Sequence, residues 1–104
     1  MQHIGQITTE VIKEFYPPET FYPQFAGGSF GKPSGNGWYQ WNGLCPFHDD
    51  HRPGSLYIRK EDGAFKCFSC GAKGGDILDF HMQKERLTFT NSLNTLRRAV
   101  SCAK

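Results

Sequence analysis

Two short pairs of cysteine and histidine residues constrain this sequence more than any other feature. The first pair is Cys45-Pro-Phe-His48, and the second, after 18 residues, is Cys67-Phe-Ser-Cys70. Within each pair the side chains are three positions apart, a spacing at which one tight turn directs both toward a single ion. Three thiols and one imidazole are a typical ligand set for tetrahedral zinc. The sequence therefore predicts one structural Zn²⁺, with no coordination position left open for catalysis.

The composition indicates why a chain of 104 residues needs such a crosslink. Phe contributes 9 residues, but Leu, Ile, Val and Phe together contribute only 22. That share is just above the level of roughly 20% below which disorder becomes the default expectation. We therefore expect the metal to hold together a core in which aliphatic residues are few. Cys102 lies outside the two pairs and is expected to be a small buried residue or a free thiol.

Other sequence features exclude several classes of protein. No apolar run approaches the roughly 18 residues of a membrane span, and the N-terminus lacks the pattern of a signal peptide. We therefore expect a cytoplasmic protein without a membrane partner, in which structural disulfides are disfavoured. The net charge of +2 is too small to establish a nucleic-acid partner, although the basic excess lies in residues 43–104.

Hydrophobic periodicity and turn residues divide the chain into a few elements. In chain order we expect a helix over 8–16, a flexible Gly-rich loop over 27–37, strands over 55–59 and 64–68, and helices beginning near Asp76 and Thr90. Asp62-Gly63 between the strands predicts a hairpin. The predicted fold class is therefore α+β, a small zinc ribbon with a short antiparallel sheet flanked by helices. Residues 1–40 and 41–104 are its two expected parts, which we expect to form one compact domain.

The segment GLCPFHDDHRPGSLYI, followed by FKCFSCGAKGGDILDFHMQKERLTF, resembles the N-terminal zinc-binding domain of bacterial-type DNA primases. This Cys-His-Cys-Cys zinc ribbon also occurs in phage, plasmid and mobile-element primases. The resemblance covers about residues 41–97 and includes both ligand pairs, Trp41 and the Gly-Asp-Ile turn. It departs from the family at Gly54, which is inserted between Pro and Ser.

The resemblance implies a non-catalytic module that binds single-stranded template DNA and assists RNA primer synthesis. The implied partner is either a primase polymerase domain, supplied in trans or missing from this chain, or a replicative helicase. The alternative is a zinc-stabilised module that docks onto a replication or mobile-element protein. An independent enzyme is disfavoured because the predicted metal site is closed and the sequence lacks a carboxylate cluster.

Basic and aromatic residues on and beside the predicted hairpin are candidates for contact with single-stranded DNA. Single strands are bound by basic grooves with aromatic faces on which bases stack. The hypothesis assigns phosphate contacts to four cations and base stacking to one of two rings. These candidates are Arg52, Arg59, Lys66 and Lys73 for phosphates, and Tyr57 or Phe68 for stacking. Trp41 is expected in the core, whereas the roles of Trp38 and Tyr39 stay open.

Overall fold

The computed structural model describes residues 7–103 as helices packed on one face of a five-stranded antiparallel sheet. The elements in chain order are α1 (Thr9–Phe15), α2 (Pro18–Tyr22), a π-helical turn η2 (Pro23–Gly27), β1 (Ser29–Gly35), β2 (Trp38–Asn42), β3 (Leu56–Arg59), β4 (Phe65–Cys67), β5 (Lys73–Gly74), α3 (Ile77–Glu85) and α4 (Phe89–Ala103). The strands lie in sequence order across the sheet. This arrangement confirms the predicted α+β class. No helix in the described part of the chain is long and apolar enough to cross a membrane.

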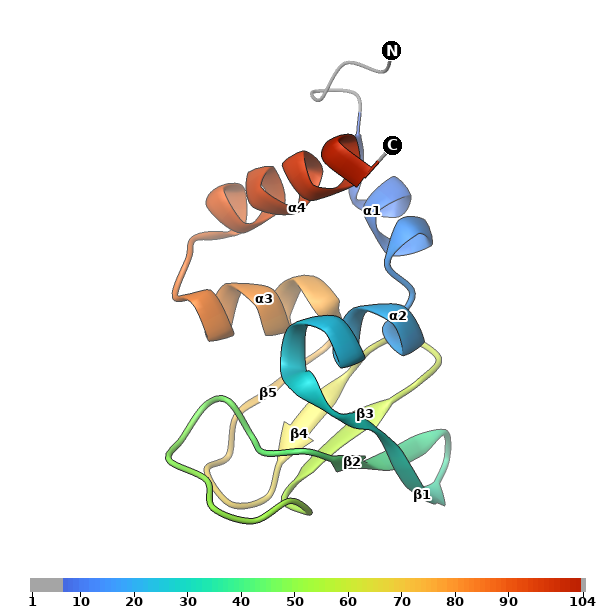
Figure 1. Cartoon of the computed structure of the whole chain (residues 1–104), viewed down its shortest axis with the longest axis vertical. Coiled ribbons are helices and arrows are strands. Elements are labelled where there is room, and N and C mark those ends of the chain that lie inside the picture. Colours follow the sequence, from blue (N-terminus) through green and yellow to red (C-terminus); the bar gives the residue numbers. More distant parts are fainter. Residues whose placement is uncertain (1–6, 104) are drawn as a thin grey trace.

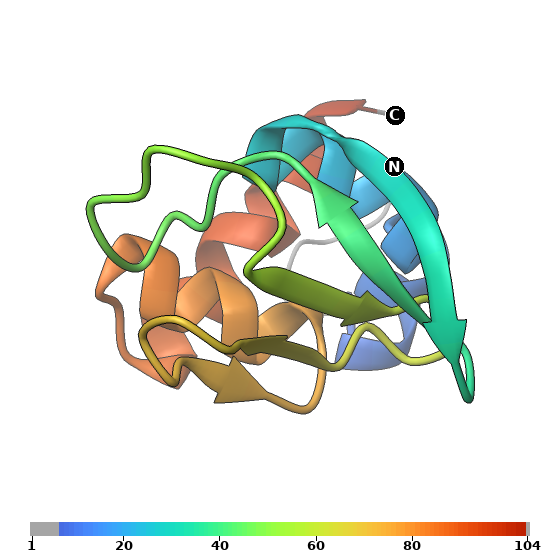
Figure 2. The same ribbon diagram turned by 90° about the horizontal axis from the view of Figure 1, so that it is seen from below.

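The helices form two layers above the sheet. Helices α2 and α3 lie next to the strands, and α1 and α4 lie beyond them (Figure 1). Seen from below, the strands stand in front of the helices, so the opposite face of the sheet has no helical cover (Figure 2). The sheet therefore has one face that contributes to the core and one face that is open.

Local sequence signals explain the predicted helices. The Thr8 hydroxyl caps α1 by accepting a hydrogen bond from the Val11 amide, and Asp76 caps α3 in the same way through the Asp79 amide. Pro18 follows the end of α1 and occupies the first turn of α2, where a missing N–H has no cost. The expected helices at 8–16, Asp76 and Thr90 are thus confirmed, whereas α2 was not predicted.

The prediction of a flexible loop over residues 27–37 is wrong. Most of this segment is β1, which forms a hairpin with β2 through Asn36 and Gly37, both with positive φ. Pro33 is tolerated because β1 is an edge strand, where no partner needs its N–H. The Gly, Pro and Ser content that indicated a loop is equally compatible with such an edge. The boundary expected between residues 40 and 41 lies within β2.

The predicted hairpin around Asp62-Gly63 is confirmed as β3 and β4. Leu56 and Ile58 are buried on the helix-facing side, together with Phe65 and Cys67 of β4. Gly63 has a φ of +82°, which favours glycine, and its carbonyl oxygen accepts a 2.6 Å hydrogen bond from the buried Tyr22 hydroxyl. This bond ties the turn to helix α2.

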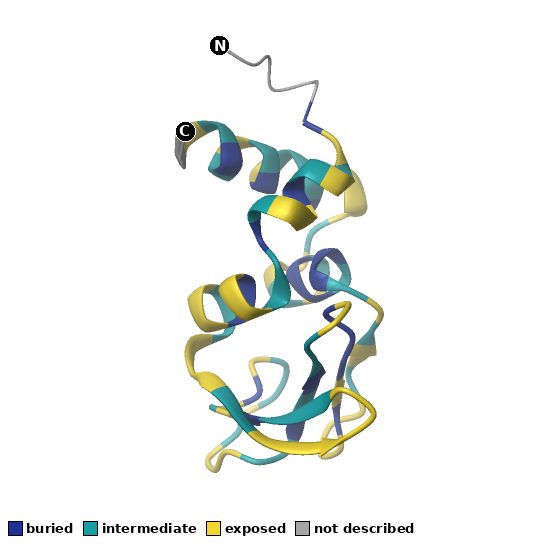
Figure 3. Cartoon of the chain, turned by 90° about the vertical axis from the view of Figure 1, so that its right-hand side faces the viewer, coloured by how far each residue is buried: buried dark blue, intermediate teal, exposed yellow. Residues whose placement is uncertain are grey.

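Aromatic rings are the largest side chains of the core. The largest are Phe21, Tyr22, Trp41, Phe65 and Phe80, each at most 1% exposed. Most neighbouring pairs meet edge to face, as Tyr22 and Phe80 do with centroids 4.8 Å apart. Buried positions gather on the helix-facing side of β3 and β4 and between the helices, while β1 and the turn after it are largely exposed (Figure 3). The core position predicted for Trp41 is confirmed.

Cys102 is a free thiol, but it is exposed rather than buried.

Candidate metal centre

The two predicted ligand pairs lie at one end of the sheet. Cys45 and His48 belong to the loop after β2, and Cys67 ends β4 just before the turn that carries Cys70. The amide of Gly71, at a φ of +82°, donates a 2.9 Å hydrogen bond to the Cys67 carbonyl. The Cys67 amide in turn donates to the carbonyl of Ala72. These bonds close the second turn and direct its two thiols to one side.

The structure brings all four ligand atoms together. They lie within 4.8 Å of one another, with 3.9 Å between the sulfurs of Cys45 and Cys70 and 3.9 Å between Cys67 Sγ and His48 Nδ1. Two sulfurs bound tetrahedrally to zinc at about 2.3 Å lie about 3.8 Å apart. The donor set and its spacing therefore fit a four-coordinate zinc ion. Cys45 and Cys67 are buried, whereas Cys70 is exposed.

Asp50 connects the first pair to its surroundings. One carboxylate oxygen accepts hydrogen bonds from the Cys45 amide at 2.8 Å and from the Ser55 hydroxyl at 3.3 Å. The other oxygen lies 3.5 Å from His48 Nε2. The Cys45 amide is the main reason that the pKa of Asp50 is lowered, so this carboxylate stays charged. Asp50 thus stands where a carboxylate can fix the orientation of a metal-binding imidazole.

The environment of the thiols separates their acidities. Burial raises the pKa of Cys45 to about 12. Burial acts in the same direction on Cys67, but the amides of Cys70 and Ser69 and the Ser55 hydroxyl stabilise its thiolate and bring its pKa to about 7. Cys67 is therefore the more readily ionised thiol of this buried pair. A cation at the centre of the cluster would favour the thiolate form of each cysteine.

Phe47 links the cluster to the core. It lies between the ligands of the first pair, and its ring stacks on Phe65 with centroids 5.5 Å apart and meets Phe80 edge to face at 5.1 Å. The loop that carries Cys45 and His48 is thus packed against both β4 and α3. The cluster and the aromatic core form one continuous unit.

A Cys-His-Cys-Cys cluster in two turns at the end of a short antiparallel sheet defines the zinc-ribbon class of proteins. Within that class, the chain belongs to the CHC2 zinc finger family, the zinc ribbon of DnaG-type DNA primases, which it matches over residues 34–103. The resemblance predicted from the sequence is therefore confirmed.

Bacterial proteins named DNA primase are similar to about half of the chain. That of Mycolicibacterium smegmatis is 43% identical over 54 residues, 52% of this chain and 8% of the primase. That of Borreliella burgdorferi is 39% identical over 56 residues, 54% of this chain and 10% of the primase. That of Listeria monocytogenes is 43% identical over 53 residues, 51% of this chain and 8% of the primase. The chain thus covers at most a tenth of the length of each of these relatives.

Three of the residues predicted to contact nucleic acid lie together on the open face. Tyr57 on β3 is paired with Lys66 on β4, and the ring of Phe68 meets that of Tyr57 edge to face at 5.2 Å. Lys66 Nζ lies 4.8 Å from the Phe68 ring centroid. These side chains line a hollow of about 340 Å³, and Phe68 is 65% exposed.

The other three predicted residues differ in their surroundings. Lys73 on β5 is paired with Lys66 and is exposed, which extends the basic part of the open face. Arg59 is on the same face, but its guanidinium forms an ion pair with Asp62 in the hairpin turn. Arg52 is exposed in the loop that follows the first ligand pair. Lys66 and Lys73 line the open face and, within residues 7–103, have no ion pair, whereas the charge of Arg59 is paired.

Trp38 is an aromatic residue of the open face to which the sequence assigned no role. It is paired with Arg59 across β2 and β3, and Arg59 Cζ lies 5.4 Å from its ring centroid. The sequence holds a signal for the position of Trp38. An Asn-Gly turn directly precedes it, and in a strand that starts there Trp38, Gln40 and Asn42 lie on the face opposite to the core residue Trp41.

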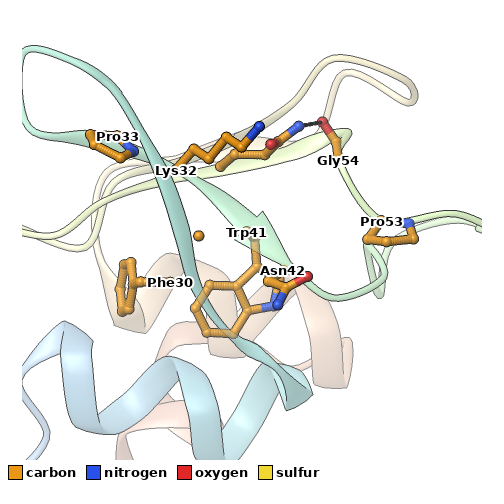
Figure 4. Close-up of a pocket in the computed structure, with 9 residues that line it drawn as sticks. Phe30, Lys32, Pro33, Trp41, Asn42, Pro53 and Gly54 are labelled. Carbon is orange, nitrogen blue, oxygen red and sulfur yellow. Dashed lines mark hydrogen bonds between the residues drawn. The ribbon is translucent and has the colours of Figure 1, made fainter.

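A further hollow, of about 570 Å³, lies between β1, β2 and the Pro53-Gly54 loop (Figure 4). Phe30 and Trp41 point from it toward the helices, whereas Lys32 lies on the side away from them (Figure 4). The Gln40 side chain closes one wall by donating a 3.2 Å hydrogen bond to the Gly54 carbonyl. Because Gln40 is paired with Tyr57, this hollow borders the aromatic part of the open face.

Proposed function

We propose that this chain is the template-binding zinc module of a DNA primase system. In this proposal it binds one Zn²⁺ through Cys45, His48, Cys67 and Cys70 and holds single-stranded DNA on the open face of its sheet. The observation that supports it best is the position of the four-residue cluster at the end of that face, beside exposed aromatic and basic side chains.

The role of the metal in this proposal is structural. With three cysteines and one histidine as ligands, the coordination sphere is full and offers no position for a substrate. A bound zinc ion would supply folding free energy, on the order of 10–16 kcal/mol in zinc-finger peptides. Deprotonation of the three thiols on binding would lower the formal net charge from +2 to about +1. Affinity for DNA would then come from where the charges lie and not from their total.

The open face has the chemistry that single strands require. Tyr57 and Phe68 present ring surfaces for stacking, and Lys66 and Lys73 supply positive charge on the neighbouring strands. The helices cover the opposite face, so a strand of DNA can reach this one without rearrangement of the fold (Figure 2). With few phosphate contacts, binding should be weak and sensitive to salt.

The test is a titration of a fluorescently labelled single-stranded oligonucleotide with the zinc-loaded chain at several salt concentrations. The Lys66→Ala/Lys73→Ala double variant should bind more weakly, and its log–log salt slope should be smaller by about 1.4, since each phosphate contact contributes about 0.7. A matched control is Lys84→Ala/Arg98→Ala, which removes two charges from α3 and α4. Equal binding by the parent and the Lys66/Lys73 variant would overturn the assignment of this face.

We further propose that a primase polymerase domain or a replicative helicase works with this module in the cytoplasm. A priming assay with a polymerase encoded beside this chain, with and without the chain, tests this role by stimulation of primer synthesis. A second candidate is a protein-docking module, which the exposed apolar residues Leu44, Phe68 and Phe89 favour. Single-strand binding by the isolated chain would support the first proposal, and its absence together with binding to the polymerase would support the second.

A further inference from the structure

Two neighbouring hollows on the open face share two lining residues. The first, the Tyr57 hollow, has a volume of about 340 Å³ and is lined by Trp38, Tyr57, Lys66, Phe68 and the 34–36 turn. The second, the Lys73 hollow, has a volume of about 450 Å³ and is lined by Trp38, Ala64, Phe65, Lys66, Lys73 and Gly74. Trp38 and Lys66 line both, so they stand at the boundary between the two hollows.

We infer that this boundary divides the open face into two base subsites, with Trp38 as the stacking surface and Lys66 as the contact to the phosphate that joins the two nucleotides. The inference rests on the proposed binding of single-stranded nucleic acid. It adds a residue, Trp38, and an arrangement of two successive nucleotides that neither the sequence nor the family match assigns.

Two features suit Trp38 to this position: its large ring and the Arg59 side chain that lies over that ring. The indole of Trp38 offers a larger π-face for stacking than the single rings of Tyr57 and Phe68. Base–aromatic stacking does not depend on base identity. The Arg59 guanidinium lies 5.4 Å from the Trp38 centroid and is itself held by an ion pair with Asp62. Arg59 is in this view a positioning residue for Trp38, because its charge is already balanced within the turn.

Lys66 is suited to the contact between the subsites. It is exposed, it lies on the strand between Tyr57 and Lys73, and its ammonium lies 4.8 Å from the Phe68 ring centroid. Two successive bases in adjacent hollows place their linking phosphate over the shared boundary, beside Lys66, which lines both hollows. Lys73 then contacts the next phosphate, beside the second hollow.

The first experiment uses tryptophan fluorescence of the zinc-loaded chain with a short oligothymidylate. Trp41 is fully buried, so quenching on binding should come from Trp38 and should be absent in Trp38→Phe. Trp38→Ala should weaken binding about tenfold, and Trp38→Phe should recover most of that loss. Phe89→Ala removes an exposed aromatic ring from α4 and is the matched control. Zinc content and circular dichroism show whether each variant is folded.

The second experiment counts the subsites with oligonucleotides that are abasic except at one position or at two adjacent positions. Two adjacent thymines should bind about tenfold more tightly than one, and this gain should disappear in Trp38→Ala. Equal binding of the two oligonucleotides, or parental affinity in Trp38→Ala, would overturn the inference. If the parent chain binds no single strand, the proposed function fails. If Lys66→Ala/Lys73→Ala weakens binding while Trp38→Ala does not, only the two-subsite arrangement fails.

Discussion

The imidazole of His48 has Nε2 3.5 Å from Oδ1 of Asp50, while its Nδ1 lies 3.9 Å from the sulfur of Cys67. The ring thus presents one nitrogen to the thiols and the other to a carboxylate. This carboxylate is also the acceptor for the Cys45 amide, so a single side chain supports both members of the first ligand pair.

Removal of the Asp50 charge should therefore weaken zinc binding without removing a ligand. We expect Asp50→Asn to lower zinc affinity by about 10–100-fold, because carboxylates that orient a metal-bound histidine have effects of that size. Competition with a chromogenic chelator measures it. Asp49→Asn is the control, since the Asp49 side chain is 92% exposed and lies next to the exposed His51. Equal losses in both variants would show that general charge, and not the Asp50 contacts, controls affinity.

Zinc removal should unfold the ribbon part of the chain. The cluster joins the loop after β2 to the end of β4, and the aliphatic core is small, so the strands depend on the metal for stability. After treatment with a strong chelator we expect a large loss of the far-UV circular dichroism signal of secondary structure. We also expect fast amide exchange in residues 43–75. Restored zinc should reverse both changes. An unchanged spectrum after verified metal removal would contradict the structural role.

The hydrogen bond between Tyr22 and the Gly63 carbonyl should stabilise the β3–β4 turn measurably. Tyr22→Phe keeps the ring in the core but leaves that carbonyl without its 2.6 Å partner. We expect the free energy of unfolding to fall by about 1–3 kcal/mol, the cost of an unsatisfied buried polar group. Chemical denaturation in the presence of zinc measures it. Tyr57→Phe, on the open face, is the matched control and should change stability by less than about 0.5 kcal/mol.

The features predictable from the sequence are those that short-range signals determine. The Cys and His spacing indicated the cluster, and alternation around Asp62-Gly63 indicated the hairpin. The β1 strand was missed because its stability comes from pairing with β2, and Ser29–Gly35 has the composition of a loop. The position of Trp38 beside Tyr57 and Lys66 likewise depends on strand register across the sheet. Register between distant segments is set by tertiary packing, which a single sequence does not display.

His81 should make stability depend on pH through helices α3 and α4. It is 3% exposed, and its Nδ1 lies 2.6 Å from the hydroxyl of the buried Ser92. Burial lowers the pKa of His81 below its ordinary value of 6.5, with Glu85 raising it and Lys84 lowering it to a smaller extent. The folded state therefore binds the proton less well than the unfolded state. The contribution of neutral His81 is complete above about pH 6.5 and is lost as the pH falls below that value.

The comparison of wild type with His81→Asn isolates this effect, because both proteins share the acid sensitivity of the zinc ligands. Between about pH 7.5 and pH 5, the difference in free energy of unfolding (wild type minus variant) should fall, with a slope of at most about 1.4 kcal/mol per pH unit below pH 6.5. Chemical denaturation at each pH, with zinc present, gives the difference. A difference that stays constant with pH for His81→Asn would show that His81 is not the group whose protonation opposes folding.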